Sequence, residues 1–172
     1  VDTLSLHDAL PISLGALLVA NEIPSDLARW MGPDRVRQAL EDLISLCREE
    51  AGELPIAYAN YPSTEYLEPR NADFTAFNVY LEAREALARY LPRLQNIAGD
   101  RPVLITEFGL DTVRNREEQQ AELLEGHLEE CLAAGIAGTT FFSWSDRWSS
   151  RGESMTNWAF GLTRSDLSEK PA

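Results

Sequence analysis

The feature that most constrains the fold of this chain is a repeated alternation of short apolar runs with longer segments of helical periodicity. Five runs have the length and apolar content of buried strands, and each is followed by a helical pattern or a long loop. Strands joined by such crossovers pair in parallel, since the connection returns the chain to the same end of the sheet. The predicted strands are residues 15–21, 55–60, 73–80, 101–109 and 137–144.

Three of the connecting segments are predicted to be helices. Asp34 is expected to cap the first, and a second is expected near residues 82–97. Asn115 and Glu118 resemble a capping box that opens the third. The apolar stripes of the first and third helices comprise Val36, Leu40, Leu43, Ile44 and Cys47, and Ala121, Leu124, Leu128 and Cys131.

Polar residues gather where the predicted strands end. A doubly wound sheet and a (β/α)8 TIM barrel both fit the strand–helix alternation. A barrel builds its active site from the C-terminal ends of its strands, and no glycine-rich phosphate loop follows any strand here. The polar strand-end residues therefore favour the barrel, and they are Asn21, Glu22, Asn60, Asn78, Tyr80, Thr106, Glu107, Trp144 and Asp146.

Composition excludes several classes of function. The net charge of −13 argues against binding to nucleic acid or to an anionic membrane. Cys47 and Cys131 are too few for a disulfide framework, and both lie on helical apolar stripes, where buried thiols are expected. His7 and His127 have no metal-ligand spacing. No apolar run approaches the length of a membrane-spanning helix.

Two glutamates end predicted strands and form the candidate catalytic pair. Glu22 ends "LLVANE" and Glu107 ends "VLITE". In glycosidic bond cleavage one carboxyl protonates the leaving oxygen, and in retaining enzymes the other attacks the anomeric carbon. The alternative is structural: Glu22 could pair with Arg29, and Glu107 with Arg101 or Arg114.

Several motifs make the interpretation more specific. "ANEIP" resembles the Asn-Glu motif that ends strand 4 of clan A glycoside hydrolases, and "LITEFGLD" resembles the strand 7 nucleophile motif of glycoside hydrolase family 2. "FNVY" and "FFSWSDRW" are similar to strands 6 and 8 of that family, and "NWAFGLTRSDLSEKPA" resembles the end of its catalytic domain. The resemblance implies an incomplete (β/α)8 TIM barrel, an α/β fold made of strands 4 to 8 with their helices.

The same resemblance implies roles for individual residues. Glu22 would be the acid/base and Glu107 the nucleophile. Tyr80 would donate a hydrogen bond that keeps Glu107 ionised, and Asn21 would bind the 2-hydroxyl of the sugar. Asn78 would line the sugar subsite. Trp144 would offer its ring to a sugar face, with barrel packing as the alternative.

The domain organisation implied is that of a fragment. Residues 3–13 resemble a translated sequencing adapter, so residues 1–13 are expected to be non-native and residues 14–172 to be the C-terminal portion of the barrel. Strands 1 to 3 would then be absent, and we expect the intact parent to be the enzyme and the isolated fragment to be inactive. "NYPSTEYL" resembles a bacterial subgroup with a fused or adjacent glycosyltransferase domain. With the true N-terminus missing, the sequence does not indicate a compartment.

The leading hypothesis is a retaining glycosidase that cleaves β-linked oligo- or polysaccharides without a metal or organic cofactor. A second hypothesis is a carbohydrate-binding or regulatory barrel, attached to a glycosyltransferase, that has lost turnover. The presence of both glutamates argues against it, because binding alone requires neither. A lyase or isomerase on the same barrel is a third hypothesis, disfavoured because the sequence has no metal-ligand cluster.

Overall fold

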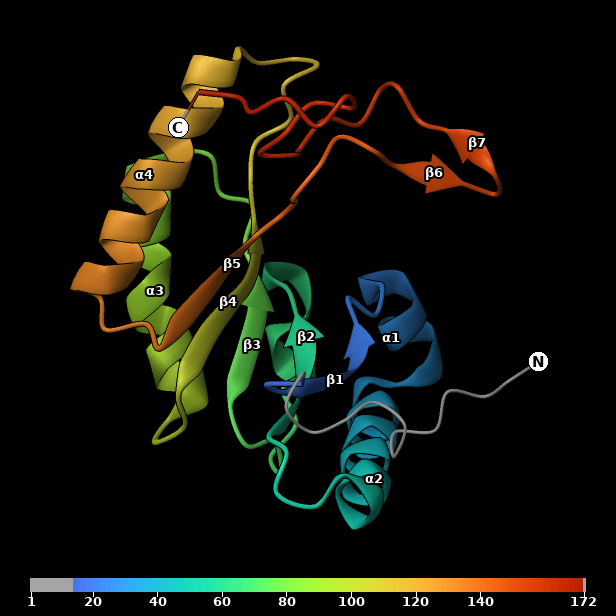
Figure 1. Cartoon of the computed structure of the whole chain (residues 1–172). Helices are drawn as coiled ribbons and strands as arrows, with labels where there is room; N and C mark the ends of the chain where they lie inside the picture. The colour runs from blue at the N-terminus through green and yellow to red at the C-terminus, as the bar shows by residue number, and fades with distance from the viewer. Residues whose placement is uncertain (1–13, 172) are drawn as a thin grey trace. The chain divides into compact units, whose positions relative to one another are not determined.

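The computed structural model describes residues 14–171, so the predicted adapter-derived segment, residues 1–13, lies outside the described residues. All five predicted strands are present, each shorter than its predicted range (Figure 1). They are hydrogen-bonded in the order in which they follow along the chain. The strands are β1 (Leu17–Asn21), β2 (Ile56–Asn60), β3 (Thr75–Asn78), β4 (Val103–Phe108) and β5 (Gly138–Phe141).

Helices connect the strands as the alternation predicted. β1 pairs with β2 in parallel, with Leu17 opposite Ile56, and β2 pairs with β3 in parallel, with Ala59 opposite Ala76. Five parallel strands with intervening helices form part of a TIM barrel, as predicted. The helices are α1 (Ser25–Met31), α2 (Pro33–Ala51), α3 (Arg84–Ala98) and α4 (Glu117–Ala133), and a short 3₁₀ helix, η2 (Pro62–Leu67), follows β2.

The described chain divides into two compact units. Unit 1 comprises the residues up to Asn78 together with Gln95–Leu104, and unit 2 comprises Val79–Leu94 and the residues from Ile105 onward. β1, β2, β3, α1 and α2 belong to unit 1, whereas β5 and α4 belong to unit 2.

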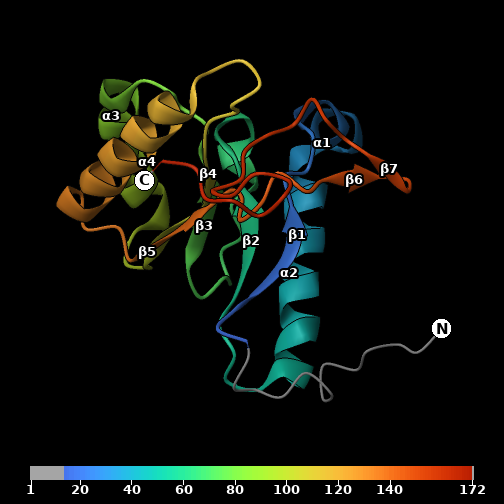
Figure 2. The same ribbon diagram turned by 45° about the horizontal axis from the view of Figure 1, so that its top comes forward.

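The core of unit 1 forms where α2 packs on the strands, and Figure 2 shows α2 lying alongside β1. Every residue of β2 is buried, as expected for a strand of a parallel sheet that is covered on both faces. Leu40 and Ile44 of α2 are fully buried against this core, but Leu43 of the predicted stripe is 43% exposed.

The start of α2 differs from the prediction. Asp34 is not the cap, because the helix begins at Pro33 and Gly32 occupies the N-cap position. Proline is preorganised for the first helical position, where its missing N–H needs no partner. Asp34 lies in the first turn instead and pairs with Arg37 at 2.6 Å. Helix α1 was not predicted, since its seven residues follow directly after Pro24.

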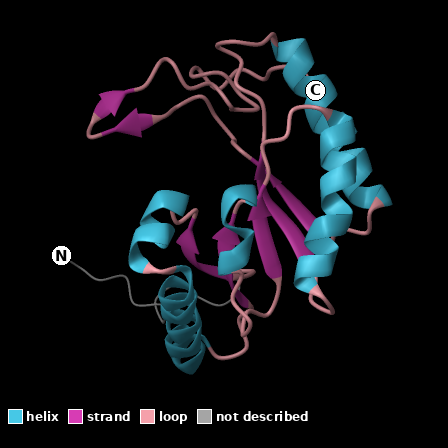
Figure 3. Cartoon of the chain, turned by 180° about the vertical axis from the view of Figure 1, so that it is seen from behind, coloured by secondary structure: helices cyan, strands magenta, loops and turns pink. Residues whose placement is uncertain are grey.

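Unit 2 is built on β5, α4 and the long segment that follows β5. Figure 3 shows that this last segment is mostly loop, apart from the small hairpin of β6 (Ser149–Ser150) and β7 (Glu153–Ser154). The predicted capping box of α4 is wrong by one residue. Arg116 is the N-cap, and its N–H donates to Oε1 of Gln119 at 3.0 Å.

The buried face of α4 is more polar than predicted. Cys131 is buried as expected, but Gln120 and His127 share that face. Leu124 and Leu128, from the predicted apolar stripe, are only half-buried.

Within residues 14–171, the cysteines form no disulfide and the side chains form no metal site. Cys131 is buried, Cys47 is partly buried, and both are free. No group of His, Cys, Asp and Glu side chains in the described range is arranged to hold a metal ion. Among the described helices, none has the length and apolar character needed to cross a membrane.

Candidate active site

Glu22 lies in unit 1, directly after β1, in an unusual backbone conformation. Its φ is 45°, in the left-handed region that residues with a side chain seldom adopt. The N–H of Glu22 donates to the carbonyl of Ala59 at 2.9 Å, which continues the β1–β2 pairing by one residue. Backbone strain of this kind is typical of residues that a fold holds for a functional purpose.

Two tyrosines from β2 and the segment after it hold the backbone that follows Glu22. The hydroxyl of Tyr58 accepts the N–H of Ile23 at 2.9 Å, and that of Tyr61 accepts the N–H of Ser25 at 3.1 Å. Tyr58 is 1% exposed, and burial raises the pKa of its phenol to about 12. The loop that carries Glu22 is therefore fixed at two points by side chains of unit 1.

Asn78 brings the Asn-Glu pair together. Its Nδ2 donates to Oδ1 of Asn21 and to Oε1 of Glu22, each at 3.0 Å. Asn78 ends β3 and is 1% exposed, whereas Glu22 is half-buried and Asn21 is exposed. Three of the six predicted site residues thus form one hydrogen-bonded cluster, which we call the Asn-Glu cluster.

Glu107 lies in unit 2, as the penultimate residue of β4. The hydroxyl of Tyr80 donates to Oε2 of Glu107 at 2.8 Å, as predicted. The N–H of Val79 donates to the carbonyl of Glu107 at 2.8 Å. Because Tyr80 follows Val79 directly, this hydrogen bond holds Tyr80 beside the end of β4. We call Tyr80 and Glu107 the Tyr-Glu pair.

The arginines considered as structural partners have other contacts. Arg101 contacts Glu68 at 3.3 Å and donates to the carbonyl of Pro69 at 2.8 Å. Arg114 lies 3.9 Å from Asp111. Arg29 makes no ion pair within the described residues, so the predicted alternative partner of Glu22 does not bind it.

The ring of Tyr80 packs edge-on against two phenylalanines. Its centroid lies 6.4 Å from that of Phe142 and 5.9 Å from that of Phe160. Phe142 is fixed in this position because its N–H donates to the carbonyl of Phe108 at 2.9 Å. This close approach requires the glycine at 109, since a Cβ there would overlap the carbonyl oxygen of Phe142.

Trp144, predicted as the aromatic platform, lies in other surroundings. It is 72% exposed and lines a groove beside α4 together with Leu124 and Leu128. Phe142, two residues earlier, is the side chain that contacts Tyr80. The sequence analysis did not single out Phe142, because "FFSW" contains three aromatic residues and the sequence does not show which ring contacts Tyr80.

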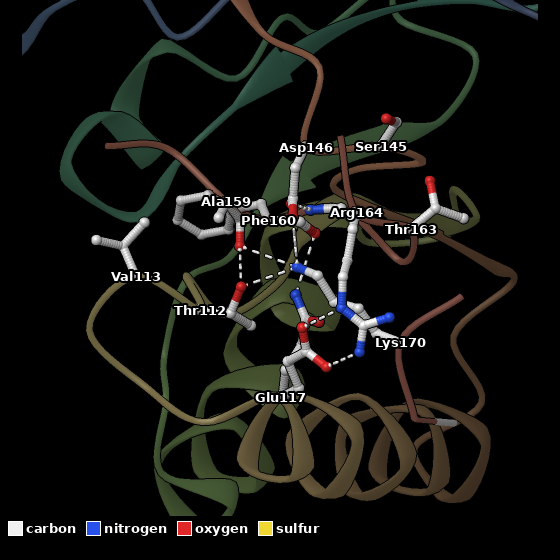
Figure 4. Close-up of polar contacts among 12 residues, drawn as sticks. Thr112, Val113, Glu117, Ser145, Asp146, Ala159, Phe160, Thr163, Arg164 and Lys170 are labelled. Carbon is white, nitrogen blue, oxygen red and sulfur yellow. Dashed lines mark hydrogen bonds and ion pairs between the residues drawn. The ribbon is translucent and has the colours of Figure 1, made fainter. Parts of the chain in front are cut away.

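Asp146 stabilises the structure beyond β5 through a buried lysine. Lys170 Nζ lies 3.0 Å from Asp146 and donates to Oγ1 of Thr112 at 2.8 Å (Figure 4). Its side chain is 2% exposed. Arg164 donates from Nε to Glu117 at 2.8 Å, so two cations tie the last described residues to the rest of unit 2. These contacts give Asp146 a structural task.

Comparisons with known proteins identify the fold. Neither the search of family models nor the search of curated proteins finds a match. Solved structures do match: β-glucuronidase from Bifidobacterium dentium, complexed with coumarin-3-O-glucuronide, is 20% identical with a TM-score of 0.67 over 80% of this chain. A GH5_18 protein from Streptomyces cattleya in complex with GlcNAc is 17% identical, with a TM-score of 0.64 over 79% of this chain. β-D-glucuronidase for Dictyoglomus thermophilum is 14% identical, with a TM-score of 0.64 over 78%.

These neighbours agree with the fold described above. The structural neighbours are TIM-barrel glycosidases, and the chain shares part of their TIM-barrel fold. The chain spans 26%, 40% and 27% of the lengths of the three structures named above, so its fold corresponds to part of each.

Proposed function

We propose that this chain is the part of a retaining glycoside hydrolase that carries both catalytic carboxyl groups, and that the intact protein cleaves β-linked glycosides. The hydrogen bond from Tyr80 to Glu107, at 2.8 Å, carries the proposal, because the resemblance implied this contact from sequence alone. A hydrogen bond donated to a carboxylate stabilises its charged form, which is the form that a nucleophile needs.

The chemistry would proceed in two displacements. Glu107 attacks the anomeric carbon as the glycosidic C–O bond breaks, and Glu22 gives its proton to the leaving oxygen. Glu22 then takes a proton from a water molecule, whose oxygen attacks the anomeric carbon and releases Glu107. The amide of Asn78 contacts both Asn21 and Glu22, which supports a shared task for the Asn-Glu cluster.

We propose that the Asn-Glu cluster and the Tyr-Glu pair serve one sugar ring. Glu22 directly follows β1, and Glu107 is the penultimate residue of β4. Parallel strands of a TIM barrel present their C-terminal ends at one mouth, where such enzymes build their sites. In this proposal the amide side chain of Asn21 binds the 2-hydroxyl of the sugar.

The aromatic floor of the subsite is part of the proposal. Apolar C–H faces of sugars pack on aromatic rings, and the ring next to Tyr80 is that of Phe142. We propose Phe142 as the platform beside the Tyr-Glu pair. Trp144 could contact substrate only from the exposed groove where it lies. Matched substitutions of Phe142 and Trp144 distinguish which ring contacts the sugar.

We propose further that the parent belongs to family 2 and that residues 14–172 are strands 4 to 8 of its barrel. In this proposal residues 1–13 are adapter-derived, and a glycosyltransferase domain is fused to the parent or encoded beside it. Determining the gene sequence upstream of Leu14 from an independent library tests all three points. A genomic sequence that encodes residues 1–13 in place would contradict the adapter proposal.

The function is tested in the full-length parent with a 2-deoxy-2-fluoro glycoside, which forms a long-lived ester with a nucleophilic carboxylate. We expect mass spectrometry to find one adduct, on the peptide that contains Glu107, and to find none in Glu107→Gln. Adduct formation that persists in Glu107→Gln, or that maps elsewhere, would exclude Glu107 as the nucleophile. Sugar binding without any adduct or turnover would favour the carbohydrate-binding hypothesis.

A further inference from the structure

Unit 1 contains a cavity that is close in sequence to Glu22 but lies outside the Asn-Glu cluster. A cavity of about 570 Å³ is lined by residues of α1, of η2 and of the start of α2. Its volume falls within the range of about 300–1,000 Å³ that is typical of small-molecule pockets. Ser25, three residues after Glu22, forms part of its wall.

The cavity carries a local positive charge in an acidic chain. Its lining includes two cations, Arg29 and Arg37, and one carboxylate, Asp34. Arg37 is already engaged, because it pairs with Asp34 at 2.6 Å and donates to the carbonyl of Tyr66 at 3.3 Å. Arg29 makes no ion pair in the described part of the chain. The cavity therefore has one guanidinium available for an anion, although the chain carries a net charge of −13.

The other lining groups suit a sugar. Ser25 and Ser63 line the cavity, and their hydroxyls make no hydrogen bond within the described residues. The backbone of Ser25 is held by Tyr61, whose hydroxyl accepts the Ser25 N–H at 3.1 Å. The ring of Tyr66 is 42% exposed and supplies an aromatic face. Hydroxyl groups with an aromatic face are the combination that binds a polar ring with apolar C–H faces.

We propose that this cavity, which we call the Arg29 pocket, binds a carboxylate-bearing sugar residue of the substrate. The inference rests on the proposed function and makes the substrate an acidic oligo- or polysaccharide. Arg29 binds the carboxylate, because a planar guanidinium matches that group with two parallel N–H donors. Ser25 and Ser63 bind sugar hydroxyls, and the sugar ring lies against Tyr66.

Isothermal titration of the 172-residue chain tests the proposal with two probes that differ only in charge. The first is a β-linked tetrauronide, and the second is the same tetrasaccharide with its carboxyl groups reduced to alcohols. We expect the charged probe to bind about fivefold or more tightly at low ionic strength, and salt to weaken this preference because the pocket is open to solvent.

Matched variants locate the effect. Arg29→Gln should abolish the preference for the charged probe, while Arg35→Gln, an exposed arginine of α2 outside the lining, should leave it unchanged. Tyr66→Ala should weaken the binding of both probes to a similar extent. Trp30→Ala should leave the binding of both unchanged, because Trp30 is 83% exposed and lies outside the lining. Circular dichroism of each variant verifies its fold.

Equal affinity for the two probes, or an equal loss of the preference in Arg35→Gln, would overturn the Arg29 pocket. The outcome is separable from that of the proposed function, because labelling of Glu107 in the parent by a neutral fluorosugar does not involve Arg29. If labelling proceeds normally while the two probes bind with equal affinity, the proposed glycosidase function is retained and the proposal of an acidic substrate is excluded.

Discussion

The two predicted catalytic glutamates are held in contrasting ways. Glu22 follows its strand in a left-handed conformation, and its position depends on hydrogen bonds that Tyr58, Ala59 and Asn78 make to it or to the adjacent backbone. Glu107 is an ordinary strand residue whose carboxylate accepts a hydrogen bond from the phenol hydroxyl of Tyr80. Two carboxyl groups in different surroundings can take different chemical roles, which is the requirement of an acid/base and nucleophile pair.

The two glutamates also differ in the interactions that position their carboxyl groups. The Asn-Glu cluster joins the amides of Asn21 and Asn78, at the ends of β1 and β3, to the carboxyl group of Glu22, whose backbone is strained, so its geometry is sensitive to the loss of a single hydrogen bond. In the Tyr-Glu pair, the ring of Tyr80 packs edge-on against the rings of Phe142 and Phe160. Its geometry depends on packing.

Replacing Glu22 with alanine in the full-length parent should lower kcat by about 10²- to 10⁴-fold for substrates with poor leaving groups, the usual contribution of general acid catalysis. Aryl glycosides with a dinitrophenol leaving group should lose far less, because that group departs without protonation. Steady-state kinetics over a series of phenols of different acidity measures the difference. An equal loss for all leaving groups would remove the acid role of Glu22.

Unit 1 should be sensitive to alkali through Tyr58. Its pKa is raised to about 12 by burial, so the unfolded chain ionises first, near pH 10. Stability is therefore complete below pH 10 and falls as pH rises, by about 2–3 kcal/mol by pH 12. Urea unfolding of the 172-residue chain should show this loss, and Tyr58→Phe should reduce it. An identical alkaline slope in Tyr58→Phe would show that the loss of stability at high pH comes from other groups.

The aromatic side of unit 2 is tested by two matched substitutions. Phe142→Leu should lower kcat/KM of the parent by about tenfold, because it removes an aromatic contact of Tyr80 and a sugar platform. Trp144→Leu should change kcat/KM little, since that ring lies in the exposed groove beside α4. The reverse order of effects would restore Trp144 as the platform.

Unit 2 should also be sensitive to acid, through His127. The ring lies 5.7 Å from Phe108, and neither ring nitrogen makes a well-formed hydrogen bond within the described residues. Burial lowers its pKa, and the charge of Arg84 acts in the same direction, against opposing effects of the Glu82 backbone and Glu130.

Because the folded state binds the proton less readily, the stability that neutral His127 contributes is complete above about pH 6.5 and declines as pH falls below it. We expect the free energy of unfolding, measured with urea, to decrease as the pH falls from 6.5 to 5. His127→Leu should flatten this slope. A slope that is unchanged in the variant would assign the acid sensitivity to other groups.

The sequence predicted the strands well because a parallel strand that is buried on both faces must be apolar along its whole length. β2 illustrates this, since all five of its residues are buried. Helix starts were predicted less well. Asp34 and Asn115 are both good capping residues, yet Gly32 is the N-cap of α2 and Arg116 is the N-cap of α4. Neighbouring residues differ little in their intrinsic preference for the N-cap position. The packing of the helix on the rest of the unit contributes more free energy and selects the residue at which the helix begins.

For the candidate site, strand ends predicted the polar residues, and the resemblance predicted the contact of Tyr80 with Glu107. Neither could predict the left-handed backbone of Glu22, because its causes, Tyr58 and Ala59, lie more than thirty residues away in the sequence. The same limit applies to Phe142, whose contact with Tyr80 depends on a close backbone approach at Gly109.

The central claim is that the Asn-Glu cluster and the Tyr-Glu pair act on one anomeric carbon. A crystal structure of the full-length parent measures it directly, as the separation of the carboxyl groups of Glu22 and Glu107. We predict about 5–5.5 Å, the spacing at which one carboxylate attacks while the other exchanges a proton. A separation above about 6.5 Å, or carboxyl groups directed into different regions of the molecule, would contradict the retaining mechanism proposed here.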